Sequence, residues 1–335
     1  MIKISAIILS IVLSLFLILS CGGGGSSSNN SSDNSDVAEI DAEKFTPPTG
    51  SCTSTDPDSP CPRRLLLATS TDGKVFERLN IVLSDQANTP NILQLSSGRI
   101  LIYYTGSNLD LSIPGSQRDG IAAAVSDDDG ENWDYYKIKF TGFGDGPPIV
   151  DPDIILMEDG TFRMYVTRGI TVGGSTKVGV LWADSDDGFN FTYGGIAAVR
   201  DDNIVDSLTC KIGSTYHMYV LNPISSGSFS YFTSTDGESF TYVSETEHKI
   251  DSETYILSNW FKESSGEYRV FAFSFINEDI RSFTTTDGTT LSAGSDVHLS
   301  FSDDNSALEK TWIKDAAVLK LKSGSYLMAY VAEIP

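Results

Sequence analysis

The chain has 335 residues, of which 45 are acidic and 23 are basic, so its formal net charge is −22 at pH 7. A chain of this charge repels the phosphate backbone, so we exclude nucleic acid as a partner. The four cysteines and three histidines show no CxxC and none of the Cys/His spacings typical of a metal site.

Residues 1–20 predict a secretory signal peptide. Lys3 precedes an apolar run over 4–19, which is shorter than the roughly 20 residues of a membrane span. The run ends in an Ile-Leu-Ser-Cys sequence at 18–21 that resembles the bacterial lipobox. That resemblance implies cleavage before Cys21 and lipid attachment to its sulfur. Because Gly22 rather than Asp follows the cysteine, we expect a lipid-anchored protein of the outer membrane or cell surface.

Residues 21–61 predict a flexible tether. The stretch 22–50 is rich in Gly, Ser, Asn and Asp, a composition that cannot bury enough apolar surface to become ordered. Cys52 and Cys61 lie in one Pro-, Ser- and Thr-rich loop, and an oxidising compartment allows them to form a disulfide. Cys210 lies in an apolar strand and is expected to be a buried free thiol.

The remaining chain, 62–335, contains five copies of one turn motif. The motif is an Asp-Gly pair followed three residues later by an aromatic residue, or by Leu in the last copy; its aspartates are Asp72, Asp129, Asp187, Asp236 and Asp287. Asp-Gly is a strong hairpin signal, and recurrence every ~50–60 residues indicates a repeat architecture. The motif resembles the Asp-box turn of sialidases and of five-bladed glycoside hydrolases, so we expect these aspartates to be structural.

Strands are predicted on both sides of every turn. The first two, 64–69 and 76–83, flank Asp72-Gly73. Five further pairs follow, each joined by a tight turn that contains Gly: 91–96 and 99–105, 153–157 and 161–167, 207–212 and 215–221, 256–262 and 267–273, and 316–321 and 325–332. A third strand, such as 120–125 or 178–183, enters the next Asp-Gly turn, and a fourth leaves it. Four strands per repeat are typical of a β-propeller blade.

The last repeat is incomplete, because only the two strands 316–321 and 325–332 belong to it. The missing pair is present at the other end of the body, as 64–69 and 76–83. Joining the two pairs completes a fifth blade and covers an exposed sheet edge. We therefore predict an all-β, five-bladed propeller over 62–335, whose N-terminal strands complete the C-terminal blade, and we expect a monomer.

This topology brings acidic residues to one mouth of the central channel. The first strand of each blade lines the channel, so the residues that open these strands share one face. Asp151, Asp206 and Asp315 take this position in three of the five blades. Neighbouring loops and strand starts supply the expected substrate-binding residues, with Trp260 able to stack on a sugar ring: Arg118, Asp119, Arg168, Asn259 and Trp260.

Clustered carboxylates suit more than one role. Like charges in a partly desolvated site raise one pKa and yield an acid beside an ionised base, which is the pair that glycoside cleavage requires. Carboxylate oxygens also suit calcium, so a structural calcium ion stays open although no cofactor is required. In a third interpretation, each Asp only accepts backbone N–H bonds where its strand begins.

One blade carries a more specific resemblance. The sequence Val-Asp-Pro-Asp-Ile at 150–154, with Asp-Gly-Thr-Phe-Arg-Met-Tyr at 159–165, resembles the clan of glycoside hydrolase families 43 and 32. The resemblance implies an acid at the start of each of the first three blades: an Asp base or nucleophile, a modulating Asp and a Glu acid. Asp151 matches the modulating Asp. Thr89 stands at the first position and Asp206 at the third, so two of the three roles are altered.

Two functions follow from these residues. The first is a surface-tethered, carbohydrate-active enzyme that cuts glycosidic bonds through Asp151, Asp206 and Asp315. The second is a non-catalytic propeller that binds a glycan or a protein through the same face. The altered first and third positions favour the binding protein, and the three converging carboxylates favour the enzyme.

Overall fold

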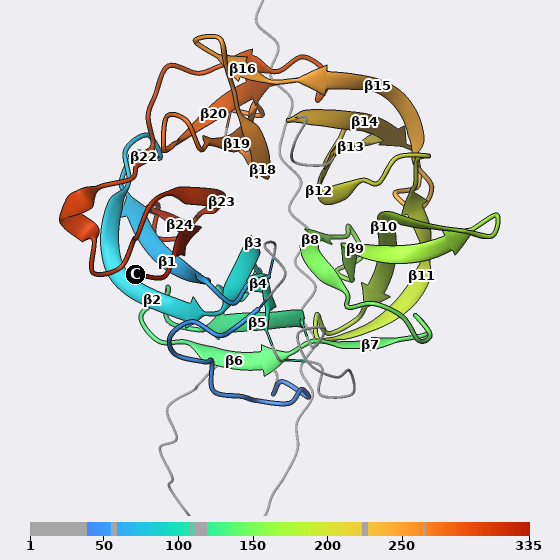
Figure 1. The fold of residues 1–335 in the computed structure, drawn as a ribbon, viewed down its shortest axis with the longest axis horizontal. Helices are drawn as coiled ribbons and strands as arrows, with labels where there is room; N and C mark the ends of the chain where they lie inside the picture. The colour runs from blue at the N-terminus through green and yellow to red at the C-terminus, as the bar shows by residue number, and fades with distance from the viewer. Residues whose placement is uncertain (1–38, 55–58, 108, 110–118, 223–226, 264) are drawn as a thin grey trace, which may run out of the picture. The chain divides into compact units, whose positions relative to one another are not determined.

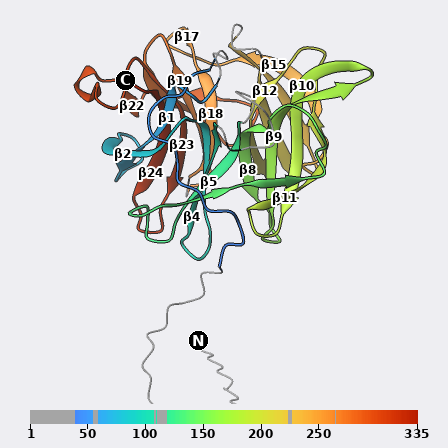
Figure 2. The same ribbon diagram turned by 60° about the horizontal axis from the view of Figure 1, so that its bottom comes forward.

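The computed structural model describes residues 39–54, 59–107, 109, 119–222, 227–263 and 265–335. Over this part of the chain, five sheets of four or five strands are arranged around a central axis (Figures 1 and 2), which confirms the predicted all-β, five-bladed propeller. The predicted signal peptide, Cys21 and Arg118 lie outside the described residues. Among the residues described, no helix is long and apolar enough to cross a bilayer.

Blades I to III follow one plan, in which strands succeed each other from the channel outward. Blade I has β3 (Ala87–Gln94), β4 (Ile100–Gly106), β5 (Gly120–Ser126) and β6 (Asp134–Lys137). Blade II has β8 (Val150–Leu156), β9 (Phe162–Val172), β10 (Ser175–Ser185) and β11 (Asn190–Ala198), with β7 (Lys139–Thr141) parallel to β11. Blade III has β12 (Val205–Ile212), β13 (Thr215–Leu221), β14 (Ser228–Ser234) and β15 (Thr241–Glu247).

Blade IV has a fragmented outer edge. It contains β18 (Ile256–Lys262), β19 (Tyr268–Ser274) and β20 (Asp279–Thr285), and β20 pairs with both β21 (Ser292–Ala293) and β22 (Leu299–Ser300). A small hairpin of β16 (Lys249–Ile250) and β17 (Glu253–Thr254) precedes it. A 3-10 helix, Asp303–Asn305, connects blade IV to blade V.

Blade V closes the ring as predicted. Its order from the channel outward is β23 (Ile313–Lys320), β24 (Tyr326–Glu333), β1 (Arg63–Ser70) and β2 (Glu77–Asp85). The strands β1 and β24 pair without a break along the whole of β1. Because side chains alternate along a strand, Leu65 and Leu67 pack toward blade I, and Leu66 and Ala68 pack toward blade IV. The closing strand therefore joins two core clusters.

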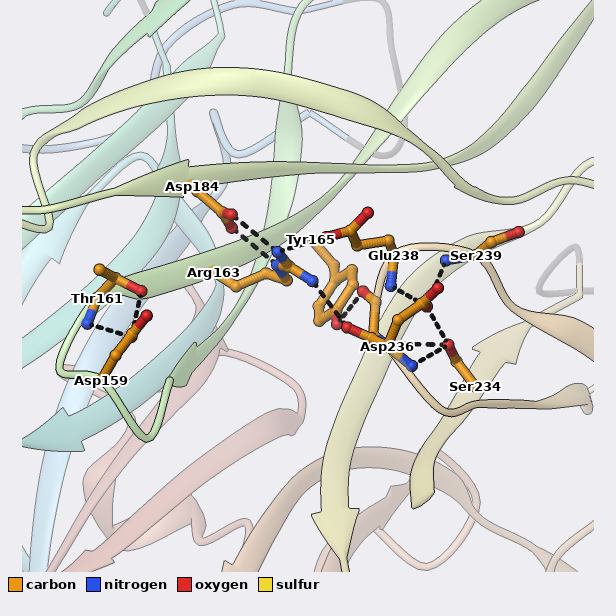
Figure 3. Close-up of polar contacts among 10 residues, drawn as sticks. Asp159, Thr161, Arg163, Tyr165, Asp184, Ser234, Asp236, Glu238 and Ser239 are labelled. Carbon is orange, nitrogen blue, oxygen red and sulfur yellow. Dashed lines mark hydrogen bonds and ion pairs between the residues drawn. The ribbon is translucent and has the colours of Figure 1, made fainter. Parts of the chain in front are cut away.

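The Asp-Gly turns are held by one hydrogen-bond pattern (Figure 3). In blade III, Asp236 Oδ1 accepts bonds from the N–H groups of Glu238 at 2.8 Å and Ser239 at 3.1 Å, and Ser234 Oγ donates to it at 2.7 Å. These bonds to the ionised form lower the pKa of Asp236 to about 2. The carboxylate stabilises the turn, which is the structural role expected for it.

Blade I departs from this pattern in one detail. The sequence alignment assigned the turn to Asp129, but the carboxylate that accepts the bonds belongs to Asp128, which accepts from the Asn132 N–H at 2.9 Å and from Ser126 Oγ at 2.8 Å. Asp129 instead has a positive φ of 57°. The cause is one additional residue between Ser126 and the glycine, which shifts the hydrogen-bonding aspartate back by one position.

Buried tyrosines connect blades I, II and III each to the blade that follows. The hydroxyl of Tyr165 on β9 donates to the carbonyl of Gly237 in the turn of blade III at 2.7 Å. Tyr103 bonds in the same way to Gly188 at 2.9 Å, and Tyr219 bonds to Gly288 at 3.1 Å. The turns are therefore contacts between blades, and the ring is fixed by polar bonds as well as by its apolar core.

Part of the predicted tether is ordered. Residues 39–45 lie along the outer strand of blade I, where the Phe45 N–H donates to Tyr135 O at 3.0 Å and the Lys137 N–H donates to Glu43 O at 2.9 Å. Their apolar side chains explain this order, because Phe45 packs against the core cluster between blades V and I. Cys52 and Cys61 form a disulfide. Cys210 is a free, buried cysteine.

Candidate functional site

The inner strands share a backbone deformation near their first residues. Thr89, Asp151, Asp206 and Asp315 have φ values of 45°, 56°, 52° and 48°, and each lies at a register shift of its strand. A non-glycine residue in this region costs about 1–3 kcal/mol and is concentrated at functional sites, and a bulge redirects its side chain. We call this end of the channel the entry mouth and the opposite end the exit mouth.

Asp151 and Asp206 form a carboxyl pair at the entry mouth. The two groups interact, and the interaction lowers the pKa of Asp151 and raises that of Asp206. Burial raises the pKa of both groups, and the charges of Asp151 and Asp315 raise the pKa of Asp206 further. Lys314 opposes the rise for both. The pair therefore retains a proton well above the pH at which a free aspartic acid loses it.

Threonines of the preceding blades hold this pair in place. The Asp151 N–H donates to Thr105 Oγ1 at 2.8 Å, and the Asp206 N–H donates to Thr167 Oγ1 at 3.1 Å. Thr89 Oγ1 lies 3.2 Å from Asp151 Oδ1. No backbone N–H of a described residue donates to either carboxyl group. The two carboxyl groups are therefore not turn-stabilising acceptors, and they remain available at the mouth.

Asp315 also lies at the entry mouth, where it is ion-paired with the neighbouring Lys314. A small cavity of about 30 Å³ separates the bulges, with Thr89, Asp151, Asp206 and Asp315 among its lining residues. This is room for one or two water molecules. The structure thus brings the three predicted aspartates together, and it adds a lysine that the sequence analysis did not identify.

A larger cavity of about 570 Å³ covers the carboxyl pair, and we call it the entry cavity. Asp119, Asp151, Asp206 and Lys314 contribute its polar lining, and Phe275 and Trp312 contribute aromatic surface. Phe275 is 43% exposed, and its ring centroid lies 5.6 Å from that of Trp312 in an edge-to-face arrangement. The volume is in the range of small-molecule sites, which combine apolar walls with a few polar groups.

Asn259 and Trp260 do not reach this cavity, which corrects their predicted position. Both line a separate cavity of about 300 Å³ at the exit mouth, together with Asp153. Asn259 accepts a bond from the Val318 N–H at 3.1 Å. The reason lies in the register of β18, whose irregularity falls at Ser258. Asn259 and Trp260 come after the bulge and belong to the part of the strand that runs toward the exit mouth.

Arg168 lines the entry cavity, but its hydrogen bonds serve the protein itself. Its Nε donates to Pro147 O at 2.9 Å, Nη1 to Phe143 O at 2.8 Å and Nη2 to Gly144 O at 3.0 Å. The guanidinium therefore fixes the loop before β8, a role that the sequence did not predict. It also lines another cavity, of about 930 Å³, which lies beside blades I and II near residues 41–43.

Two aromatic residues and a lysine of the site were missed from the sequence. Phe275 lies in the loop between β19 and β20, the second and third strands of blade IV. The equivalent loop of blade I contains Asp119. Trp312 and Lys314 lie three residues and one residue before Asp315, and the sequence analysis considered only the aspartate. Among the described residues, no group of three or more His, Cys, Asp or Glu side chains is arranged to hold a metal ion.

The fold is similar to solved propellers of several activities. A protein of unknown function from Dyadobacter fermentans is 15% identical, with a TM-score of 0.53 over 84% of this chain and 86% of that chain. A thermostable family-43 glycoside hydrolase is 12% identical, with a TM-score of 0.55 over 73% and 88%. An N-acetylgalactosamine deacetylase from F. plautii is 13% identical, with a TM-score of 0.54 over 77% and 81%. No protein-family model and no curated protein matches the sequence.

Proposed function

We propose that this propeller binds a glycan in the entry cavity. The observation that carries the proposal is that one cavity is lined by the carboxyl groups of Asp151 and Asp206, whose pKa values are raised by burial, and by the aromatic side chains of Trp312 and Phe275. A sugar presents hydroxyl groups that bond to carboxyl groups and C–H faces that pack on aromatic rings. The similar hydrolase and deacetylase structures share the fold at 12–13% identity, so the proposal rests on the cavity itself.

The arrangement favours binding over cleavage. Glycoside hydrolysis uses two carboxyl groups about 5–5.5 Å or 6.5–9.5 Å apart, on opposite sides of the scissile bond. The cavity that Asp151, Asp206 and Asp315 line together has a volume of about 30 Å³, which leaves no room for a sugar ring between these carboxyl groups. Asp315 is engaged by Lys314, and Thr89 takes the equivalent position in blade I. The carboxyl pair therefore acts as one hydrogen-bonding unit on the cavity floor.

Hydrolysis is the second candidate, because Asp119 lines the same cavity as the carboxyl pair. In that case Asp206, whose pKa is raised well above its usual range, supplies the proton, and Asp119 acts as the base.

Replacing Trp312 by Ala is expected to weaken glycan binding about two- to tenfold, because contact with an aromatic ring contributes about 0.5–1.5 kcal/mol. The matched control is Trp260→Ala, which removes the same side chain at the exit mouth and should leave the affinity unchanged. Binding is measured by calorimetry with ligands found on a glycan array. Equal losses in both variants, or no loss in Trp312→Ala, would contradict the proposed cavity.

The same preparations decide between binding and cleavage. Wild-type protein, Asp119→Asn and Asp206→Asn are incubated with the bound oligosaccharides and with aryl glycosides. Binding without turnover in the wild type supports the binding protein. Turnover that both substitutions abolish supports the hydrolase.

We further propose that the protein is anchored in the bacterial envelope by a lipid on Cys21, on the basis of the lipobox-like sequence at 18–21. When the full chain is expressed in a bacterium fed a fatty-acid analogue, the wild type and Cys210→Ser should incorporate the label. Cys21→Ser should not. Labelling that persists in Cys21→Ser would rule out this attachment site.

A further inference from the structure

We infer that the glycan of the entry cavity carries an anionic substituent, a carboxylate or a sulfate ester, and that Arg168 binds it. This inference rests on the proposed glycan site and names the class of sugar that the site takes. It starts from the charge balance of the buried arginines.

Three arginines of the described chain are more than nine-tenths buried: Arg64, Arg163 and Arg168, with 8%, 5% and 7% of their surface exposed. Arg64 is paired with Asp85 at 2.7 Å. Arg163 is paired with Asp184 at 2.8 Å and with Glu238 at 3.4 Å (Figure 3). Arg168 bonds only to backbone carbonyl groups, and no carboxylate among the described residues forms an ion pair with it.

This difference is visible in the electrostatics. Burial lowers the pKa of Arg168, and the charge of Asp145 offsets the effect only in part. Arg163, which is equally buried, has a raised pKa because Asp184 and Glu238 stabilise its charge. A buried charge without a partner is strongly destabilising. In a chain with a net charge of −22, a carboxylate partner was readily available. Its absence at a cavity wall indicates that the partner is supplied by the ligand.

The guanidinium has the donors that such a ligand needs. It carries five N–H groups, and three of them are used by the loop carbonyls. Two N–H groups remain for a ligand, and charge-assisted bonds from a guanidinium suit the oxygens of a carboxylate or a sulfate ester. The loop is built closely around the group: a Cβ on Gly146 would approach Arg168 Nη2 to 2.6 Å. The side chain is thereby held in one position at the cavity wall, so little conformational entropy is lost on binding.

The rest of the cavity tolerates an anion. Two further cations line it from blade V, Arg63 on β1 and Lys314 on β23. Burial and the charge of Asp151 raise the pKa of Asp206, which reduces the negative charge on the cavity floor. The cations of the lining therefore offset the acidic floor, although the protein as a whole is strongly acidic.

The experiment compares ligands that differ only in charge. Affinities of the purified protein are measured by calorimetry for oligogalacturonate and its methyl ester, and for a sulfated galactan oligomer and its desulfated form. We expect at least a tenfold preference for the charged member of one pair, since a charge-assisted hydrogen bond contributes about 1.5–3 kcal/mol. The pair that shows the preference identifies the substituent. Equal or weaker binding of the charged members would overturn the inference.

Substitutions then assign the preference to Arg168. Arg168→Gln should bind the charged and neutral members equally, and Arg168→Lys, which keeps the charge but loses the planar fork, should retain part of the preference. Arg99→Gln is the control, because Arg99 pairs with Asp127 at 2.8 Å and does not line this cavity. If Arg168→Gln does not fold, Arg168→Lys decides: an unchanged preference there rejects Arg168. If no oligosaccharide binds at all, the proposed function fails, which is a distinct result from binding without charge preference.

Discussion

Replacing Asp153 by Asn should stabilise the protein at pH 8 by up to about 4 kcal/mol and have little effect near pH 4. Asp153 is 2% exposed, its Oδ1 accepts a bond from Asn91 Nδ2 at 3.3 Å, and burial raises its pKa from 3.8 to about 7. Between these values the folded protein keeps the proton that the unfolded chain has lost. Folding stability therefore falls as the pH rises from about 4 to 7, by about 1.4 kcal/mol per pKa unit. Asparagine is neutral throughout and removes this loss.

The measurement is urea unfolding of both proteins at pH 4, 6 and 8. The control is Asp159→Asn, because hydrogen bonds from Thr161 lower the pKa of that exposed carboxylate. Because the pKa of Asp159 is lowered, the wild-type protein gains stability from this group as the pH rises. Asp159→Asn should therefore remove a gain in stability, whereas Asp153→Asn removes a loss. Parallel stability profiles for the wild type and Asp153→Asn would show that the carboxyl group does not titrate in this pH window.

Replacing Arg163 by Met is expected to lower the free energy of unfolding by about 2–4 kcal/mol. Arg163 bonds to Asp184 in its own blade and to the carbonyl of Asp236 at 3.1 Å in the turn of blade III (Figure 3). Its guanidinium also lies 4.2 Å from the Trp182 ring. Breaking a fully buried pair costs about 3–5 kcal/mol. The expected loss is smaller because Asp184 and Glu238 are each nearly half exposed and regain water.

Arg99→Met is the matched control. Arg99 makes a similar two-bond contact to Asp127, at 2.8 and 3.0 Å, but within blade I. Its removal should cost less than about 1 kcal/mol, as is usual for pairs with an exposed partner. Comparable losses in the two variants would mean that the bond between blades II and III adds nothing to the stability of the ring.

The architecture was predictable because the sequence repeats one turn motif five times. Each Asp-Gly turn combines a residue that accepts local N–H bonds with one that adopts positive φ without strain, and strands rich in β-branched and aromatic residues flank it. The incomplete last repeat then allowed one closure only, the pairing of β1 with β24. The same topology brought Asp151, Asp206 and Asp315 to one mouth, where the structure places them.

The finer features of the site depend on geometry that composition does not encode. A bulge shifts the register of an inner strand, and its position, Ser258 in blade IV and Asp151 in blade II, decides which side chains face the entry mouth. The loop bonds of Arg168 depend on the path of residues 143–147, which have no regular pattern. Trp312 and Phe275 meet only after the ring has closed, because they come from blades V and IV.

The pairing of β1 with β24 also affects how the chain reaches its native state. The hairpin of β1 and β2 is synthesised first, yet its inner partner is completed only when residue 333 has been made. Until then the edge of β1, which carries Leu65, Leu66 and Leu67, has no partner strand. Strand β24 of another molecule can pair with it equally well. Two chains that exchange this hairpin would each complete the other's ring and form a domain-swapped dimer. High concentration during refolding therefore favours intertwined pairs over single propellers.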